Sequence, residues 1–118
     1  MTTGAELRQK RCAPCEGHVQ PLSLNEAQSL AASVPQWKLV ANGRCLRREW
    51  RVKDFPAAMD FFRRVAEIAE AEGHHPDLHL VDYRQVTIEL WTHAVNGLTE
   101  NDFILAAKID ELPVEMKT

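Results

Sequence analysis

Three histidines fall within six positions of the chain, in the stretch EGHHPDLHL at residues 72–80. His74 and His75 are adjacent, His79 follows four residues later, and His93 lies further along the chain. Imidazole has an unperturbed pKa of about 6.5, so one ring can donate a proton and another accept one at neutral pH. Two or three such rings around a heterocycle can expel a water molecule from it. The stretch therefore suggests acid–base chemistry.

Two other interpretations compete for these histidines. A protonated histidine at a helix C-terminus interacts favourably with the helix dipole, so His74 and His75 could serve only to end a helix. A metal site is conceivable because His74, His75, His79 and His93 are enough ligands. None of them forms an i, i+4 pair on a regular helix, however, and the zinc motif HExxH is absent. No metal is expected.

Caps and turn signals predict the elements that position these residues. Ser23 and Glu26 have the spacing of a capping box, and Asn42-Gly43 is a hairpin turn signal. The expected elements are a helix between residues 23 and 35, strands near 37–41 and 44–52, a helix between 54 and 73, strands near 78–82 and 85–92, and a helix that begins after residue 99. This order favours an α+β fold, a four-stranded antiparallel sheet with three helices packed on one face.

Apolar spacing indicates which side of each element faces the core. The long second helix carries one apolar stripe, made of Phe55, Ala58, Met59, Phe62, Val65, Ala66 and Ala69. The last helix directs Phe103, Leu105, Ala106, Ile109 and Leu112 inward. Because His93 has the parity of the polar positions of the last strand, a regular strand would aim it away from the core.

Length and composition limit the class of protein. At 118 residues the chain fits one domain, and a net charge of -3 with 45% hydrophobic and 26% charged residues argues against a large basic surface for nucleic acid. No stretch approaches the ~20 apolar residues of a membrane span, and the polar start lacks the apolar core of a signal peptide. We expect a cytosolic protein without a nucleic-acid or membrane partner.

Three cysteines do not form a disulfide framework. Cys12 and Cys15 form a lone CxxC, and Cys45 stands apart. One CxxC supplies two of the four ligands of a tetrahedral zinc site, and no second pair completes it. We expect residues 1–20 to be a loosely ordered arm and residues 21–118 to be the folded domain. Intermolecular zinc binding or redox chemistry of the arm stays open.

Several ordered motifs together resemble one known family. They are EAEGHHP at 70–76, the run from Tyr83 to Val86, WTH at 91–93, and GLTENDFILAAKID at 97–110. This pattern resembles the signature of the pterin-4a-carbinolamine dehydratases, over about 95 residues from the first predicted helix to the last. The segment between Pro76 and Tyr83 is one residue longer than in mammalian members. His79 lies in that segment, and the CxxC arm also lies outside the signature.

The resemblance implies a fold and an activity. The fold is a four-stranded antiparallel sheet with three helices on one side, in agreement with the element order. The activity is that of a lyase, which dehydrates 4a-hydroxy-tetrahydropterin to quinonoid dihydropterin in tetrahydropterin recycling. No cofactor is implied, and the family assembles as a homodimer or a dimer of dimers. The alternative function is a non-catalytic protein-binding or assembly factor built on the same fold.

The resemblance also suggests roles for the histidines. His74 and His93 are the expected proton-transfer pair, and His75 is expected to fix the pterin. Carbinolamines already collapse unaided, so positioned acid–base groups are sufficient for the reaction.

Five further residues are expected to bind or orient the substrate, and each has a structural alternative. They are Glu70, Pro76, Tyr83, Trp91 and Asp102. Glu70 would orient a histidine, or be a solvated helical residue. Tyr83 and Trp91 would stack on the pterin, or belong to the core. Asp102 would bind the pterin or a histidine, although its place in a capping box explains it fully. Pro76 is interpreted as a backbone constraint.

Overall fold

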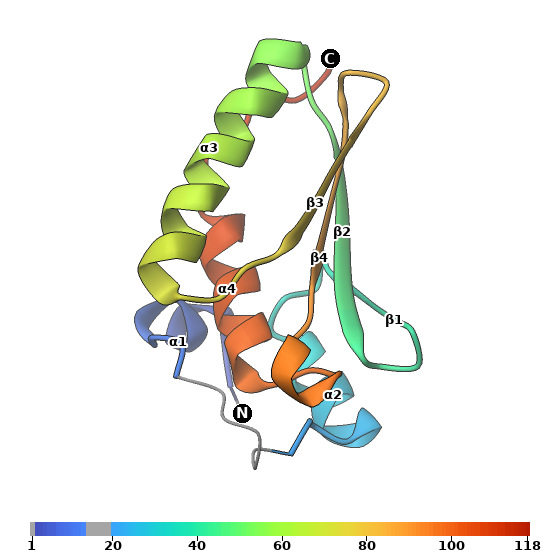
Figure 1. Ribbon diagram of the computed structural model, residues 1–118, viewed down its shortest axis with the longest axis vertical. Helices are drawn as coiled ribbons and strands as arrows, with labels where there is room; N and C mark the ends of the chain where they lie inside the picture. The colour runs from blue at the N-terminus through green and yellow to red at the C-terminus, as the bar shows by residue number, and fades with distance from the viewer. Residues whose placement is uncertain (1, 14–19) are drawn as a thin grey trace.

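A computed structural model describes residues 2–13 and 20–118 of the chain. Its sheet has the order β1-β2-β4-β3, with every neighbouring pair antiparallel. The strands are β1 (Lys38–Val40), β2 (Cys45–Arg51), β3 (Asp77–Val81) and β4 (Gln85–Leu90). Figure 1 shows the helices α3 (Phe55–Glu72) and α4 (Glu100–Asp110) together on one side of this sheet. The predicted α+β class and the four-stranded antiparallel sheet are confirmed.

The two central strands place alternate side chains in the core. Leu46 pairs with Leu90 and Trp50 pairs with Val86, and all four side chains are buried. Between them, Arg47 and the other odd-numbered positions of β2 point to the face that the helices leave open. The period-2 pattern of the sequence therefore sets which face of the sheet meets the helices.

Helix α3 begins and ends where the sequence predicts, but its apolar stripe is rotated. Asp54 caps it by accepting a hydrogen bond from the Ala57 N–H at 2.9 Å, and Gly73 ends it in the left-handed conformation. The buried residues are Ala58, Phe61, Val65 and Ala69.

Phe55 and Met59, which were expected inward, are about half exposed, and Ala66 is exposed as well. Phe61 takes the inward position because its ring packs edge-on against Trp50 of β2, with 5.1 Å between ring centroids. The predicted stripe was therefore wrong at Phe55, Met59 and Ala66. The sequence around α3 could not show this, because Trp50, which contacts Phe61, lies on another element of the chain.

The N-terminal arm is more ordered than the sequence suggests. Residues Gly4–Gln9 form the helix α1, whose Leu7 is completely buried. This helix packs along α4, as Figure 1 shows beside the N-terminus. The expectation of a loose arm is thus wrong for α1, and Cys15 lies outside the described residues.

The remaining helices follow their predicted caps. Helix α2 (Leu24–Ala31) begins with the Ser23–Glu26 capping box, with hydrogen bonds of 2.9 and 3.1 Å. Helix α4 buries the four predicted residues Phe103, Leu105, Ala106 and Ile109, and also Ile104 and Ala107. Leu112 is only half-buried. Because α1 covers the side of α4 that turns away from the rest of the fold, α4 has almost no exposed face.

We expect Leu7→Ala to lower the free energy of unfolding by about 2–5 kcal/mol, the usual cost of truncating a buried leucine. The matched control is Leu24→Ala, because Leu24 is half exposed and should lose only about 1 kcal/mol. Urea unfolding followed by circular dichroism measures both variants. Equal losses in the two would show that α1 does not stabilise the fold.

Candidate active site

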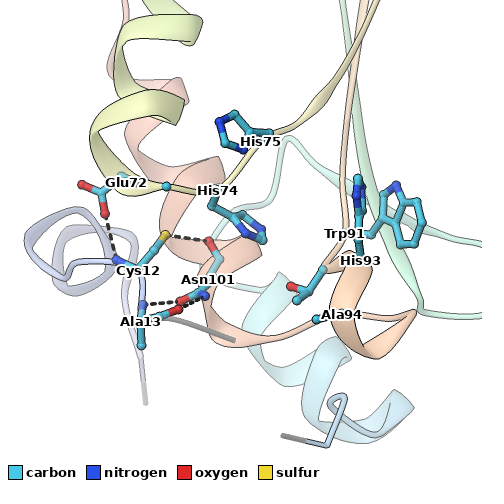
Figure 2. Close-up of a pocket in the computed structure, with 11 residues that line it drawn as sticks. Cys12, Ala13, Glu72, His74, His75, Trp91, His93, Ala94 and Asn101 are labelled. Atoms are coloured by element: carbon cyan, nitrogen blue, oxygen red, sulfur yellow. Dashed lines mark hydrogen bonds between the residues drawn. The ribbon is translucent and has the colours of Figure 1, made fainter. Parts of the chain in front are cut away.

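One pocket brings the three predicted catalytic histidines together. It has a volume of about 370 Å³ and lies where the C-terminus of α3, the end of β4 and the start of α4 meet. Its lining residues are Cys12, Ala13, Glu72, Gly73, His74, His75, Trp91, Thr92, His93, Ala94 and Asn101. Figure 2 shows His74 and His75 between Cys12 on one side and His93 with Trp91 on the other. The pocket is large enough for a flat bicyclic molecule.

The end of α3 aims His74 into the protein. Gly73 has φ 65°, a left-handed conformation that glycine adopts without steric cost, and the His74 N–H donates to the Ala69 carbonyl at 3.2 Å. The His74 side chain is only 12% exposed. Its Nε2 lies 2.6 Å from Oδ1 of Asp102.

Asp102 is a buried carboxylate that is fully hydrogen-bonded. Its Oδ2 accepts from the Thr92 hydroxyl at 2.8 Å and from the Thr99 N–H at 3.0 Å, and its residue is 0% exposed. An ionised carboxylate only accepts, so Nε2 of His74 is the donor to Oδ1. This leaves Nδ1 of His74 as the ring nitrogen that is available for proton transfer.

His75 has the opposite environment. Its side chain is 63% exposed, and its Nε2 lies 2.5 Å from Oε2 of Glu70, which is also exposed. Adjacent side chains diverge on an extended backbone, as the sequence predicts. Pro76 follows directly and leads into β3, and it does not line the pocket. Glu70 therefore reaches the site only through His75.

His93 lies on a short turn rather than at the end of a strand. Strand β4 ends at Leu90, two residues earlier than predicted, and His93 begins the 3-10 helix η1 (His93–Val95). A pair of backbone hydrogen bonds between Thr92 and Gly97 closes this turn. The His93 ring lies against Trp91, with 4.0 Å between centroids and a 42° tilt.

Trp91 contacts both the start of β3 and the turn that carries His93. Its indole N–H donates to Asp77 at the start of β3 with a distance of 2.8 Å. The ring is therefore held on its edge by a hydrogen bond while one face meets His93. Of the two aromatic residues that were expected to stack on a substrate, Trp91 lines the pocket.

Tyr83 and His79 lie away from the pocket. Tyr83 occupies the tight turn between β3 and β4, at φ 50°, with the Arg84 guanidinium 4.9 Å from its ring. Figure 1 places this turn at the opposite end of the hairpin from the C-terminus of α3. His79 pairs with Glu89 at 3.0 Å on the open face of the sheet. The structure does not bring either residue to the histidine pocket.

Sequence analysis did not identify one wall of the pocket. Cys12 and Ala13 line it, although they belong to the arm that lies outside the recognised signature. The Cys12 N–H donates to Oε1 of Glu72 at 2.8 Å, and Lys108 donates to Oε2 of the same carboxylate, also at 2.8 Å. No local motif signals these contacts, because they join residues that are 36 and 60 positions apart.

The charges on this wall are set by burial and pairing. Burial, followed by the nearby Glu72 carboxylate, raises the pKa of the Cys12 thiol to about 12. Burial also tends to raise the pKa of Glu72, but the hydrogen bonds from Lys108 and the Cys12 N–H outweigh it and hold that pKa below its ordinary value. Cys12 is therefore a neutral thiol at neutral pH, and Glu72 is ionised. Among residues 2–13 and 20–118 no group of three or more His, Cys, Asp or Glu side chains is arranged to hold a metal ion.

Comparison with known proteins identifies the family. Residues 20–112 match the family model described as pterin 4 alpha carbinolamine dehydratase. The chain belongs to this family. The predicted class, a dehydratase of the hydro-lyase type, is confirmed at the level of the family.

Individual relatives agree with the family match. The chain is 54% identical over 114 residues to pterin-4-alpha-carbinolamine dehydratase 2, mitochondrial, of Arabidopsis thaliana, covering 94% of this chain and 61% of that protein. A Methylococcus capsulatus protein of the same enzyme name is 47% identical over 92% of this chain and 95% of its own. The crystal structure of a transcriptional coactivator/pterin dehydratase from Brucella melitensis has a TM-score of 0.71 and 31% identity, covering 77% of this chain and 96% of that one.

We expect Glu72→Gln to lower the free energy of unfolding by about 1–3 kcal/mol at pH 7, because Lys108 loses its charged partner. Since the pKa of Glu72 is lowered in the folded state, its stabilising effect is complete above the ordinary value of 4.5 and is lost as pH falls further. The difference between variant and parent should therefore shrink below that pH. Urea unfolding at a series of pH values measures it.

The control is Glu67→Gln on the same helix, where an exposed glutamate pairs with Arg63 at i,i+4. Exposed pairs of this kind contribute about 0.3–0.5 kcal/mol. A Glu72→Gln effect that is as small as this control, or that does not change with pH, would contradict the prediction.

Proposed function

We propose that this chain dehydrates 4a-hydroxy-tetrahydropterin to quinonoid dihydropterin and water by histidine acid–base catalysis. The observation that carries the proposal is the convergence of His74, His75 and His93 on one pocket in a member of this dehydratase family. Tetrahydropterin recycling is the process that this reaction would serve. The substrate is a small molecule, in keeping with the size of the pocket.

The reaction needs one proton donor and one proton acceptor. The bond between C4a and the hydroxyl oxygen breaks, and the N5 lone pair forms the C4a–N5 double bond. The leaving hydroxyl takes a proton and departs as water, while N5 loses its proton. Protons and electrons balance without a further reagent, so two positioned imidazoles are sufficient.

The environment of His74 suits it to accept the N5 proton. Its Nε2 donates to the buried Asp102 carboxylate, so the imidazolium that forms when Nδ1 takes a proton is stabilised by an adjacent negative charge. Asp102 itself does not touch the substrate in this scheme. It is a positioning residue that holds the ring and its tautomer.

His93 is assigned to the leaving hydroxyl. It lies on the other side of the pocket, is exposed to solvent from which it can be reprotonated, and is held against Trp91. His75, held by Glu70, is placed to bind the pterin ring system from the mouth of the pocket. Trp91 offers a flat surface for that ring system, and Pro76 restricts the backbone after His75.

A non-catalytic role as a protein-binding or assembly factor is the second candidate. It is favoured by one observation, the printed title of the Brucella structure, which names a transcriptional coactivator as well as a dehydratase. A binding factor has no need for a carboxylate-held histidine inside a pocket, so the site geometry supports the enzyme.

Location and assembly are predictions from the sequence. None of the helices within residues 2–13 and 20–118 has the length and apolar character to cross a bilayer. The cytosolic location stays a prediction, and the Arabidopsis relative is named as mitochondrial. The homodimer or dimer of dimers also stays a prediction, which sedimentation of the purified chain can test.

We expect His74→Ala and His93→Ala each to lower kcat at least about tenfold, since positioned acid–base groups contribute roughly 10²–10⁴-fold. The assay follows the disappearance of 4a-carbinolamine generated in situ by an aromatic amino acid hydroxylase. His79→Ala is the matched control, because His79 pairs with Glu89 outside the pocket and should keep parental turnover. Unchanged kcat in both pocket variants would rule out the proposed mechanism, whereas a parent chain without turnover would favour the binding factor.

We expect Asp102→Asn to lower kcat about tenfold or more while KM changes less, because an amide at this position no longer stabilises the His74 imidazolium. Nitrogen NMR of the His74 ring reports the consequence directly. The parent should show a proton on Nε2, and the variant should show a changed tautomer population. A parent ring protonated only on Nδ1 would contradict the assigned role of Asp102.

A further inference from the structure

We propose that the N-terminal segment Cys12–Ala13 is a substrate-binding wall of the pocket, held in place by Asn101 and Glu72. This inference rests on the proposed function, because the substrate it contacts is the pterin. It concerns residues that the family match, which begins at residue 20, does not include. The wall would set substrate affinity, while the histidines on the other side transfer protons.

The segment lies where it can contact a molecule bound next to the histidines. Cys12 and Ala13 line the same pocket as His74, His75 and His93. In Figure 2 they lie on one side of His74, and Trp91 and His93 lie on the other. A flat ring that lies in this pocket beside His74 therefore has Cys12 and Ala13 along one of its boundaries.

Asn101 binds the backbone of Ala13 at both of its polar groups. The Ala13 N–H donates to Oδ1 of Asn101 at 2.9 Å, and the Asn101 amide donates back to the Ala13 carbonyl at 2.6 Å. This is the pairing that a neighbouring strand would supply. Asn101 is only 6% exposed and lies in the first turn of α4, directly before Asp102. The segment is thus fixed to the same helix start that fixes His74.

Glu72 holds the segment at Cys12, one residue before the position that Asn101 holds. Its side chain is 9% exposed, and it accepts from the Cys12 N–H and from Lys108. The Cys12 thiol points toward the Asn101 carbonyl, with 3.6 Å between sulfur and oxygen. Two side chains from two helices therefore hold two consecutive backbone positions, which is more than a loose chain end requires.

The chemistry of this wall suits binding rather than proton transfer. Cys12 presents a neutral, polarisable thiol, and Ala13 presents a methyl group and peptide atoms. Neither changes charge near neutral pH. Loosening the segment should therefore weaken the hold on the pterin and leave the chemical step nearly unchanged, which predicts a change in KM rather than in kcat.

The first experiment replaces the side chain that binds the segment. Asn101→Ala removes both hydrogen bonds to Ala13, and we expect KM for the carbinolamine to rise about tenfold while kcat stays within about twofold. Asn25→Ala is the matched control, since Asn25 is exposed on α2 and should leave both constants unchanged. A normal KM in Asn101→Ala would overturn the proposal, and so would a loss confined to kcat, which would mean that Asn101 acts only through Asp102.

The second experiment needs no variant of Asn101, so it holds if that variant does not fold. In a Cys15→Ser chain, Cys12 and Cys45 are alkylated slowly by iodoacetamide at alkaline pH, with 7,8-dihydrobiopterin present or absent. Cys45 is the internal reference, because it does not line the histidine pocket and its thiol pKa is also raised by burial, to about 11. The hollow that Cys45 lines shares Trp91 with that pocket but none of the histidines. At ten times the dissociation constant, Cys12 should react about tenfold more slowly and Cys45 at its original rate.

The outcomes separate this inference from the proposed function. If the parent turns over carbinolamine and binds dihydrobiopterin, but Cys12 is not protected, the wall proposal fails and the dehydratase proposal stands. If the parent neither turns over nor binds the pterin, both fail together. Protection of Cys12 but not of Cys45, together with a raised KM in Asn101→Ala, supports the wall as a part of the substrate site.

Discussion

The site depends on one buried carboxylate, that of Asp102. It has no exposed surface, and an isolated ion in such a place would cost far more than a domain of this size can tolerate. It is stable because three groups donate to it: His74 from beyond α3, Thr92 from beyond β4, and the Thr99 N–H at the start of α4. The three segments that form the pocket therefore meet at one charge.

The two oxygens of Asp102 serve different purposes. Oδ2 accepts from the Thr99 N–H and the Thr92 hydroxyl, which caps α4 and attaches it to the end of β4. Oδ1 is left for His74. The position in the first turn of a helix also favours a negative charge through the helix dipole. The structural and the functional interpretations of Asp102 were alternatives in the sequence, but one carboxylate supplies both.

The sequence was sufficient where the determining contacts are local. The capping boxes at Ser23 and Thr99, the glycine at position 73 and the alternation in β4 act within a few residues. The helix starts and the strands lie within about two residues of their predicted bounds, whereas α2 ends at Ala31, four residues before Pro35. The divergence of His74 and His75 followed from backbone geometry alone. These features required no knowledge of distant partners.

The sequence prediction was wrong where a residue far away in the sequence determines how an element packs. The apolar stripe of α3 could be turned toward Met59 or toward Phe61, and only Trp50 on β2 decides in favour of Phe61. Tyr83 was grouped with the site because it belongs to the recognised signature, yet a hairpin separates its turn from the pocket. Membership of a motif does not by itself place a residue.

One unused signal in the sequence does point to the N-terminal wall. The run FILAA at residues 103–107 is apolar on every side of a helix, and such a helix must be covered on more than one face. The sheet and α3 cover part of α4, so another segment has to cover the rest, and α1 does so with Leu7. Burial of α1 then brings Cys12 to Glu72, two residues before His74. The same helix end that aims the His74 ring thus also holds Cys12 through Glu72, so two residues of backbone separate the two attachments.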